Sequence, residues 1–476
     1  MSNGMPQERP RTWIPVVLQA VSPTRVRRVP RAPTVSLRPD RPDRSGGQPA
    51  LAAAAAVVGA LTGLTAATFR VLLEHAGEAR VDLVRWAHGS PVLGFALVVL
   101  VCAAGTSAAA WLVHRVEPHA EGSGIPRVEA VVEGRKAPGR FRILPVKYAG
   151  GLLSIGSGLA LGREGPSVQM GGTIAAVVGR ALRRSSTDVR LLVAAGAAAG
   201  LATAFNAPIA GGVFVLEELL KRFDPRTTLA TLVASAAGFA SAHALLHTST
   251  SDFTVPHLAE PSLTQAPVVL VVGVASGLVG AAYNWAVIRS LRIADTSRWP
   301  VVARAALIGA AVGAVGWFGP GLVGGGDNLT QQALLGRGTI VTVTALLALR
   351  FVLGVGSYAA CTPGGLFAPM LVLGSNVGLL VGLVGQLVVP HQTPEPAALA
   401  LIGMAAFFTA SVRAPVTGLV LATEMTASTT LLPPMLGACA VAMLTAAVLR
   451  STPIYDQLTQ RAVVASRVNA AEGHPD

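Results

Sequence analysis

Long apolar segments separated by short polar connectors run along most of the chain. The first two begin near Ala50 and Pro91, and each approaches the length of about 20 apolar residues that a bilayer-spanning helix needs. Further apolar segments cover residues 143–162, 165–182, 190–219, 227–247, 264–288, 301–318, 340–359, 364–390, 396–412 and 416–449. Several are short for a full span or are interrupted by Gly and Pro, as in the broken helices of transporters. The pattern predicts an all-α polytopic membrane protein.

The composition excludes an ordinary soluble fold for most of the chain. Of the 476 residues, 52% are hydrophobic and 13% are charged, whereas a soluble domain carries about 25% charged residues. Cys102, Cys361 and Cys439 lie far apart in apolar surroundings. This favours small buried hydrophobic side chains over a disulfide or a metal site. We expect no metal and no cofactor.

The charges of the connectors predict the topology. Residues 221–226 and 289–304 are basic, which favours the cytosolic side. Residues 248–264 and 391–397 contain no Lys or Arg, which favours the outside. We therefore expect a multi-pass protein of a plasma membrane of the bacterial inner-membrane type, with both termini in the cytosol.

The N-terminal tail is basic and rich in proline. Nine arginines oppose three acidic residues within the first 45 positions, a net charge of +6. We expect a disordered cytosolic tail, and contact with anionic lipid is an alternative. Nucleic-acid binding is not expected, because no folded basic module follows the tail.

A weak internal repeat divides the membrane region. The pattern A-P-x-x-G begins at Ala207 and again at Ala414, and a glutamate follows ten residues later in both copies, at Glu217 and Glu424. Two homologous halves would place a site between them, near the middle of the bilayer. The predicted organisation is a tail at 1–47, a first membrane half at 48–247, an external linker at 248–264, a second membrane half at 265–449, and a C-terminal helix with a short cytosolic tail at 450–476.

Three glycine-rich segments precede apolar, helix-compatible runs. They are E-G-S-G-I-P at 121–126, G-R-E-G-P at 162–166 and G-G-L-F-A-P at 364–369. Proline is favoured in the first turn of a helix, and a helix start carries free N–H groups and about half a positive charge, so it can bind an anion. Three converging starts would bind an anion without a dedicated Lys or Arg. The alternative is that these are ordinary helix breaks.

Two glutamates adjoin these apolar runs. Glu164 lies between two of them, where an ionisable group is costly unless it is functional or paired; the alternatives are a local pair with Arg163 or exposure in a loop. Glu218 ends another run, and Lys221 and Arg222 follow at the spacing of an ordinary helix-end charge pair. From the residues alone, both assignments stay open.

Taken together and in this order, the three segments closely resemble the GSGIP, GREGP and GxFAP signatures of the CLC family of chloride channels and chloride/proton antiporters. The resemblance extends from about Ala50 to Leu458 and includes F-N-A-P at 205–208 and R-A-P at 413–415. It implies a CLC-type bundle of tilted and broken helices in two inverted-repeat halves. It also implies a homodimer in the lipid bilayer, with one anion path per subunit.

The resemblance also implies roles for individual residues. Glu164 would be the external gate, which competes with chloride for the anion site and leaves when protonated. Glu218 would transfer protons at the internal end, where channel members usually lack a carboxylate. The residues implied to contact chloride are Ser123, Gly124, Ile125, Gly165, Leu366, Phe367 and Tyr455. The residues implied to support the site are Gly122, Arg163, Glu217, Glu129 and Lys147, of which Glu129 and Lys147 are expected to pair.

The sequence therefore predicts proton-coupled exchange of chloride, mainly because Glu218 is present. A passive voltage- or pH-gated chloride channel is the alternative. Arg127 departs from the family pattern, and at the cytosolic side it would attract anions by its field. A cation/proton antiporter would need clustered acidic or carbonyl ligands, and no enzyme motif of the H-E-x-x-H or G-x-S-x-G type occurs in the sequence.

Overall fold

The computed structural model describes residues 47–246 and 252–471, with side chains up to residue 463. Residues 1–46 of the predicted N-terminal tail at 1–47, the start of the predicted linker and the last five residues lie outside the described residues.

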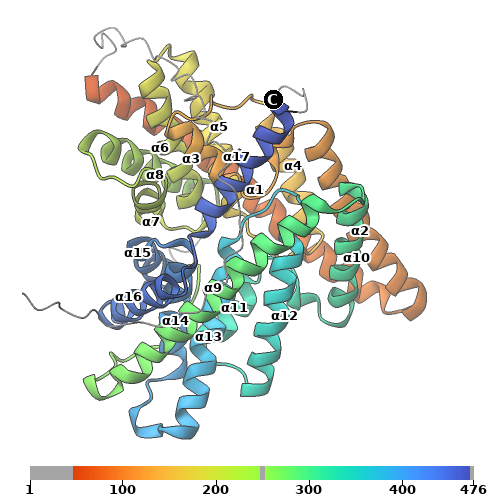
Figure 1. The fold of residues 1–476 in the computed structure, drawn as a ribbon, viewed down its shortest axis with the longest axis vertical. Coiled ribbons are helices and arrows are strands. Elements are labelled where there is room, and N and C mark those ends of the chain that lie inside the picture. Colours follow the sequence, from red (N-terminus) through yellow and green to blue (C-terminus); the bar gives the residue numbers. More distant parts are fainter. Residues whose placement is uncertain (1–46, 247–251, 472–476) are drawn as a thin grey trace, which may run out of the picture. The chain divides into compact units, whose positions relative to one another are not determined.

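The described residues form seventeen α-helices (Figure 1). Those of the first half are α1 (Gly47–Ala87), α2 (Pro91–Arg115), α3 (Ile125–Val132), α4 (Ile143–Gly156), α5 (Glu164–Ala181), α6 (Ser186–Ala204), α7 (Pro208–Phe214) and α8 (Pro225–Leu246). Those that follow are α9 (Ala266–Thr296), α10 (Val301–Phe318), α11 (Asp327–Leu334), α12 (Ile340–Tyr358), α13 (Phe367–Val388), α14 (Pro396–Val412), α15 (Pro415–Thr426), α16 (Leu432–Val448) and α17 (Ile454–Ala471). Short helical turns join them: η1 (Pro118–Ala120), the π-turn η2 (Val215–Leu219), η3 (Leu263–Gln265), η4 (Pro320–Leu322) and η5 (Pro390–Gln392).

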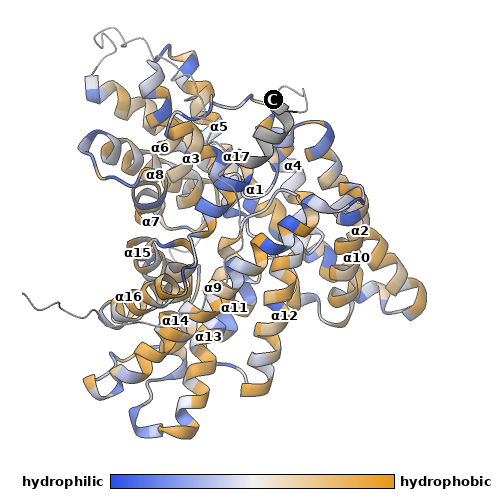
Figure 2. Cartoon of the chain, viewed as in Figure 1, coloured by the Kyte–Doolittle hydropathy of each residue, from blue (hydrophilic) through white to orange (hydrophobic). Residues whose placement is uncertain are grey.

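Eight of the helices in the described part of the chain are long and apolar enough to cross a membrane. Large apolar side chains remain exposed on several of them, among them Val92, Phe318 and Val352. Figure 2 shows hydrophobic colour over much of α10, α12 and α16. Apolar surface on this scale fits a lipid surrounding, because in water it would be a liability. The protein is a multi-pass membrane protein.

The helices of the first half recur in the second. The short α3 and α11 contain 8 residues each, and each follows a glycine with positive φ. α1 packs on α8 as α9 packs on α16, and α5 packs on α6 as α13 packs on α14. Across the two halves, α2 packs on α10 and α7 packs on α15 (Figure 1). The predicted internal repeat is therefore present in the fold.

The apolar segments at 190–219 and 416–449 each contain a helix break, as expected of broken helices. The first contains α6, a turn with Asn206 at φ 53°, and then α7 and η2. The second breaks between α15 and α16 after Ala427 at φ 52°. Proline at 208 lacks an N–H and its ring disfavours an uninterrupted helix there, so the backbone breaks within an apolar run.

Candidate functional site

The three glycine-rich segments meet through backbone hydrogen bonds. Gly122 N donates to Thr362 O at 3.2 Å, and Gly364 N donates to Gly122 O at 3.1 Å. Gly162 and Gly365 exchange two N–H···O bonds of 2.8 Å each. Segments more than 200 residues apart in sequence are thus held side by side.

Each of these segments leads into a helix. α3 begins at Ile125, α5 at Glu164 and α13 at Phe367, so the predicted helix starts are confirmed. The first N–H groups of a helix have no partner within it and carry partial positive charge. The family resemblance implies that six residues of these helix starts contact chloride: Ser123, Gly124, Ile125, Gly165, Leu366 and Phe367.

Two glycines allow the close approach of these segments. Gly124 has φ +78°, and a Cβ atom there would collide with the side chain of Gln169. A Cβ atom on Gly165 would lie 2.8 Å from Ser123 Cα. Only glycine is compatible with both the left-handed backbone and the packing at Gly124.

Tyr455 lies beside this meeting point, at the start of α17. Its side chain is 1% exposed, and its ring centroid lies 6.0 Å from that of Phe367 and 6.4 Å from that of Phe214. The phenol oxygen is buried and has no hydrogen-bond partner in the described part of the chain. It lies within electrostatic range of Glu164 and Glu218. A buried donor of this kind requires an explanation, and a bound anion supplies one.

Glu164 is the first residue of α5 and is 2% exposed. Its Oε2 atom has no partner among the described residues. A Cβ atom on Gly365 would lie 3.4 Å from that oxygen, so the carboxylate sits against the paired glycine segments. A buried carboxylate with an unpartnered oxygen is costly, which favours a functional role over a structural one.

Arg163 does not form the local pair with Glu164 that was the alternative. Its guanidinium lies 3.3 Å from Asp327 and 3.6 Å from Asp252, and it donates to Ala204 O at 3.0 Å. Arg163 therefore joins the segment before α5 to three other parts of the chain.

Glu218 lies in η2, the π-turn that follows α7. It is 6% exposed, and its carboxylate has no hydrogen-bond partner among residues 47–246 and 252–463. Lys221 lies within electrostatic range of Glu218, but its direct bond is to Asp456 at 3.0 Å, and Arg222 lies 3.5 Å from Asp224. Single π-turns within helices are frequent at functional sites.

Glu217, the neighbour of Glu218, is fully engaged. Its carboxylate accepts from Val416 N at 3.0 Å, from Thr417 N at 2.7 Å and from the Thr417 hydroxyl at 2.7 Å. These donors form the first turn of α15, so Glu217 caps a helix of the other half.

The second half returns the same contact. Glu424 accepts from Ile209 N at 3.0 Å and from Ala210 N at 2.6 Å, in the first turn of α7. The repeated glutamates thus cap each other's helices, and they fix η2 relative to α15.

The predicted pair of Glu129 and Lys147 is wrong. Lys147 is fully buried and donates to Ala120 O at 3.0 Å and Gly122 O at 2.6 Å. Glu129 instead accepts from Thr459 at 2.8 Å, and Arg135 lies 3.6 Å away. Lys147 therefore supports the Gly122 segment through its carbonyls, which spacing along the chain could not reveal.

Two cavities adjoin the site. The larger, of about 490 Å³, is lined by Ser123 and is here named the Ser123 cavity. The smaller, of about 160 Å³, is lined by Glu164 and is named the Glu164 cavity. The Ser123 cavity lies near the start of α10. Its lining residue Arg461 bonds at 2.7 Å to Asp295, which stands at the end of α9, a few residues before α10 begins. The second is lined by residues 323–325, just beyond the end of α10, a helix of 18 residues and therefore about 27 Å long.

Comparison with known proteins identifies the family to which this chain belongs. Residues 105–447 match the sequence model of a family described as "Voltage gated chloride channel". The chain belongs to this family, the CLC family. The predicted family and the predicted all-α CLC-type fold are therefore confirmed.

Relatives of known name include proteins called "H(+)/Cl(-) exchange transporter ClcA". The one from Vibrio parahaemolyticus is 34% identical over 405 residues, which cover 84% of this chain and 87% of the relative. The one from Salmonella paratyphi A is 35% identical over 381 residues, which cover 78% of each chain.

Solved structures of CLC proteins also match. One described as a slow cyanobacterial Cl⁻/H⁺ antiporter has a TM-score of 0.83 and 33% identity, and the match covers 87% of this chain and 98% of that one. A eukaryotic CLC transporter has a TM-score of 0.71 at 21% identity, with 86% and 73% covered, and supports the fold alone.

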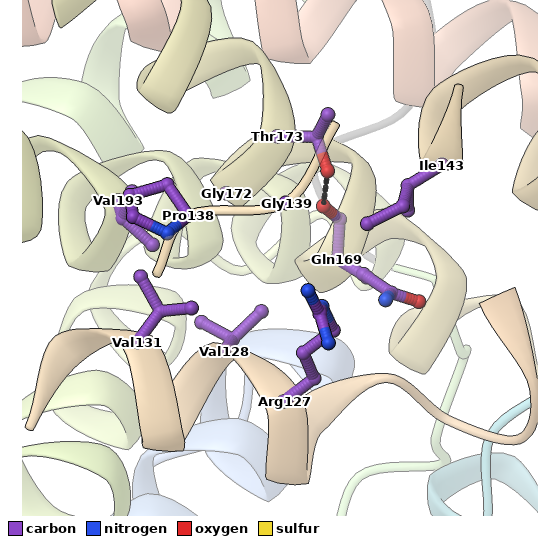
Figure 3. Close-up of a pocket in the computed structure, with 10 residues that line it drawn as sticks. All are labelled: Arg127, Val128, Val131, Pro138, Gly139, Ile143, Gln169, Gly172, Thr173 and Val193. Atoms are coloured by element: carbon purple, nitrogen blue, oxygen red, sulfur yellow. Dashed lines mark hydrogen bonds between the residues drawn. The ribbon is translucent and has the colours of Figure 1, made fainter. Parts of the chain in front are cut away.

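Arg127, where this CLC chain departs from the family pattern, lines two cavities. One is the Ser123 cavity. The other is a pocket of about 20 Å³ between α3 and α5, where Figure 3 shows Arg127 extending toward Gln169. Its position in the Ser123 cavity fits the predicted effect of its field on anions.

The sequence did not predict several contacts of this CLC site. Tyr358 meets Ser123, and Asp252 and Asp327 meet Arg163. These pairs lie between 89 and 235 positions apart, beyond the reach of local sequence patterns. Within the described ranges, no cluster of three His, Cys, Asp or Glu side chains could hold a metal ion.

Proposed function

We propose that this CLC protein exchanges chloride for protons across its membrane. The observation that carries the proposal is the pair of buried carboxylates, Glu164 and Glu218, both within electrostatic range of Tyr455. The Oε2 atom of Glu164 has no hydrogen-bond partner among the described residues. Relatives named as H⁺/Cl⁻ exchange transporters support it. A passive channel needs no second titratable group at Glu218.

The anion site would use neutral donors. Its donors would be backbone N–H groups at the starts of α3, α5 and α13, together with the Ser123 and Tyr455 hydroxyls. Helix dipoles and hydroxyls hold an anion without a full cation, so the anion can be released as well as bound. The proposed chloride contacts are Ser123, Gly124, Ile125, Gly165, Leu366, Phe367 and Tyr455.

Glu164 would act as the gate. Its carboxylate is an anion near positive helix ends, so it competes with chloride for the same environment. Proton uptake neutralises it and removes that attraction, after which chloride can take its place. Glu218 would pass protons from the other side, and Glu217 would hold η2 in place for it.

The orientation follows from charge. The Ser123 cavity adjoins Asp295, in the basic connector at 289–304, and is lined by Arg127, Arg135, Lys136 and Arg461. We assign this cavity to the cytosol by the positive-inside rule, and the Glu164 cavity to the outside. A homodimer in an inner-membrane-type bilayer completes the proposal.

The test is a liposome assay with chloride and pH electrodes recording together. We expect an outward chloride gradient to drive protons inward against their own gradient, at a fixed ratio. Chloride movement without proton movement in the wild type would instead establish a passive channel.

A further inference from the structure

Tyr358, the last residue of α12, is built into the wall beside Ser123. The Ser123 N–H donates to Tyr358 Oη at 3.4 Å, and a Cβ atom on Gly122 would lie 3.1 Å from the same oxygen. The tyrosine side chain is only 6% exposed. The phenol thus contacts the segment whose serine is the proposed chloride ligand.

The hydrogen of this phenol is available to another partner. Because Tyr358 Oη accepts the Ser123 N–H, its own O–H points elsewhere, and the further hydrogen-bonding contact of the phenol is with the Ser123 side chain. Ser123 Oγ accepts from Ile125 N at 3.4 Å, which leaves its hydrogen free to point the same way. Both side chains line the Ser123 cavity. Two hydroxyl donors on one wall favour an acceptor, and an anion is the strongest kind.

The surroundings of the two hydroxyls favour anions. Arg127, Arg135, Lys136 and Arg461 line the Ser123 cavity, and Glu121 is its acidic side chain. Acidic partners balance part of the charge of Arg461 and Arg135. The positive charge that remains raises the local concentration of anions. Uncharged hydroxyls then supply short-range contacts from which an anion can leave.

Tyr358 also connects the cavity to the buried site. Tyr455 does not line the Ser123 cavity, but it lies within electrostatic range of Tyr358. An anion that moves from the cavity to Tyr455 therefore passes the wall that carries Ser123 and Tyr358.

We propose that Tyr358 contacts the transported anion, its hydroxyl and that of Ser123 donating to one monovalent halide on the way to Tyr455. This inference rests on the proposed function, since it adds a residue to the same anion path. It makes Tyr358 a determinant of chloride affinity at the cytosolic end.

The experiment removes one oxygen atom. Calorimetric titration of the purified full-length protein with chloride compares the wild type with Tyr358→Phe. Loss of one hydrogen bond to an anion weakens chloride binding by about tenfold or more. The substitution also removes the acceptor of the Ser123 N–H, so the thermal unfolding midpoint is measured beside the affinity. Tyr283→Phe is the matched control: Tyr283 is also buried, its oxygen also has no partner in the described chain, and it lies outside the Ser123 cavity.

Each outcome decides a separate point. Chloride affinity that is unchanged or tighter in Tyr358→Phe overturns the proposal, and so does an equal loss in both phenylalanine variants. A wild type that binds chloride but moves no protons overturns the exchange proposal. The Tyr358 assignment is then decided separately, by the chloride affinity of Tyr358→Phe. Normal exchange with unaltered affinity in Tyr358→Phe removes only Tyr358.

Discussion

The first residues of α5 and α13 occupy matching places in the two halves of the chain, and they are Glu164 and Phe367. The same contrast recurs after the repeated capping glutamates. Glu217 is followed by Glu218, whereas Glu424 is followed by the buried Met425. In both places the first half carries a carboxylate where the second half carries an apolar side chain.

The supports around these positions are nearly the same in both halves. Lys147 on α4 donates to two carbonyl groups in the segment before α3. Arg350 on α12, at the matching position, donates to Leu322 O at 3.2 Å and to Gly324 O and Gly325 O at 2.9 Å each, before α11. A buried cation thus holds a carbonyl-lined loop in each half.

The comparison separates scaffold from chemistry. Helix starts, capping glutamates and buried cations are shared, so they belong to the architecture. Glu164 and Glu218 are not shared, so they are the residues for which the fold alone gives no reason. Buried carboxylates are retained at a cost where function requires them.

The largest expected effect comes from Glu218→Met. This variant gives position 218 the methionine that occupies the matching position, Met425, in the second half. Proton movement should fall by more than about 100-fold, the typical contribution of a positioned proton-transfer group, while chloride movement continues. The two-electrode liposome assay measures both. Glu218→Gln tests the same point with less change in shape, and Glu395→Gln, at an exposed position before α14, is the control. An unchanged proton-to-chloride ratio in both Glu218 variants would remove Glu218 from the mechanism.

Glu164→Gln should uncouple transport and abolish its dependence on external pH. In the wild type, lower external pH protonates Glu164 and frees the anion site, so chloride turnover should rise by up to about tenfold per pH unit for one proton. The amide cannot titrate, so the variant should give a flat profile. Turnover measured at several external pH values checks this. Uphill proton movement that persists in Glu164→Gln contradicts a gating role.

The capping glutamates should show smaller and similar effects, because both halves use them alike. Glu217→Ala and Glu424→Ala should each cost about 1–2 kcal/mol, the scale of a lost helix cap with its charge. Glu217→Ala should be the more costly, since that carboxylate also accepts from the Thr417 hydroxyl. Thermal unfolding in detergent measures the difference. If only one of the two variants is destabilised, the reciprocal caps are not equivalent.

The sequence alone predicted those features of the site that depend on a few neighbouring residues. Glycine and proline at helix starts, and charged residues within apolar runs, act over a few neighbouring positions. They predicted the starts of α3, α5 and α13 and drew attention to Glu164. The same locality explains the errors at Glu129 and Lys147, whose partners lie in other segments.

By itself, the sequence determined that this chain is a helical membrane protein with three glycine-rich helix starts and two carboxylates in apolar runs. Apolar length, backbone restriction and the cost of buried charge each depend on short stretches of chain. The tertiary structure alone decided that Glu217 caps α15, that Lys147 holds the Gly122 segment and that Tyr358 meets Ser123. Contacts such as these join residues as far as 235 positions apart, and they arise because packing of the two halves brings distant segments together.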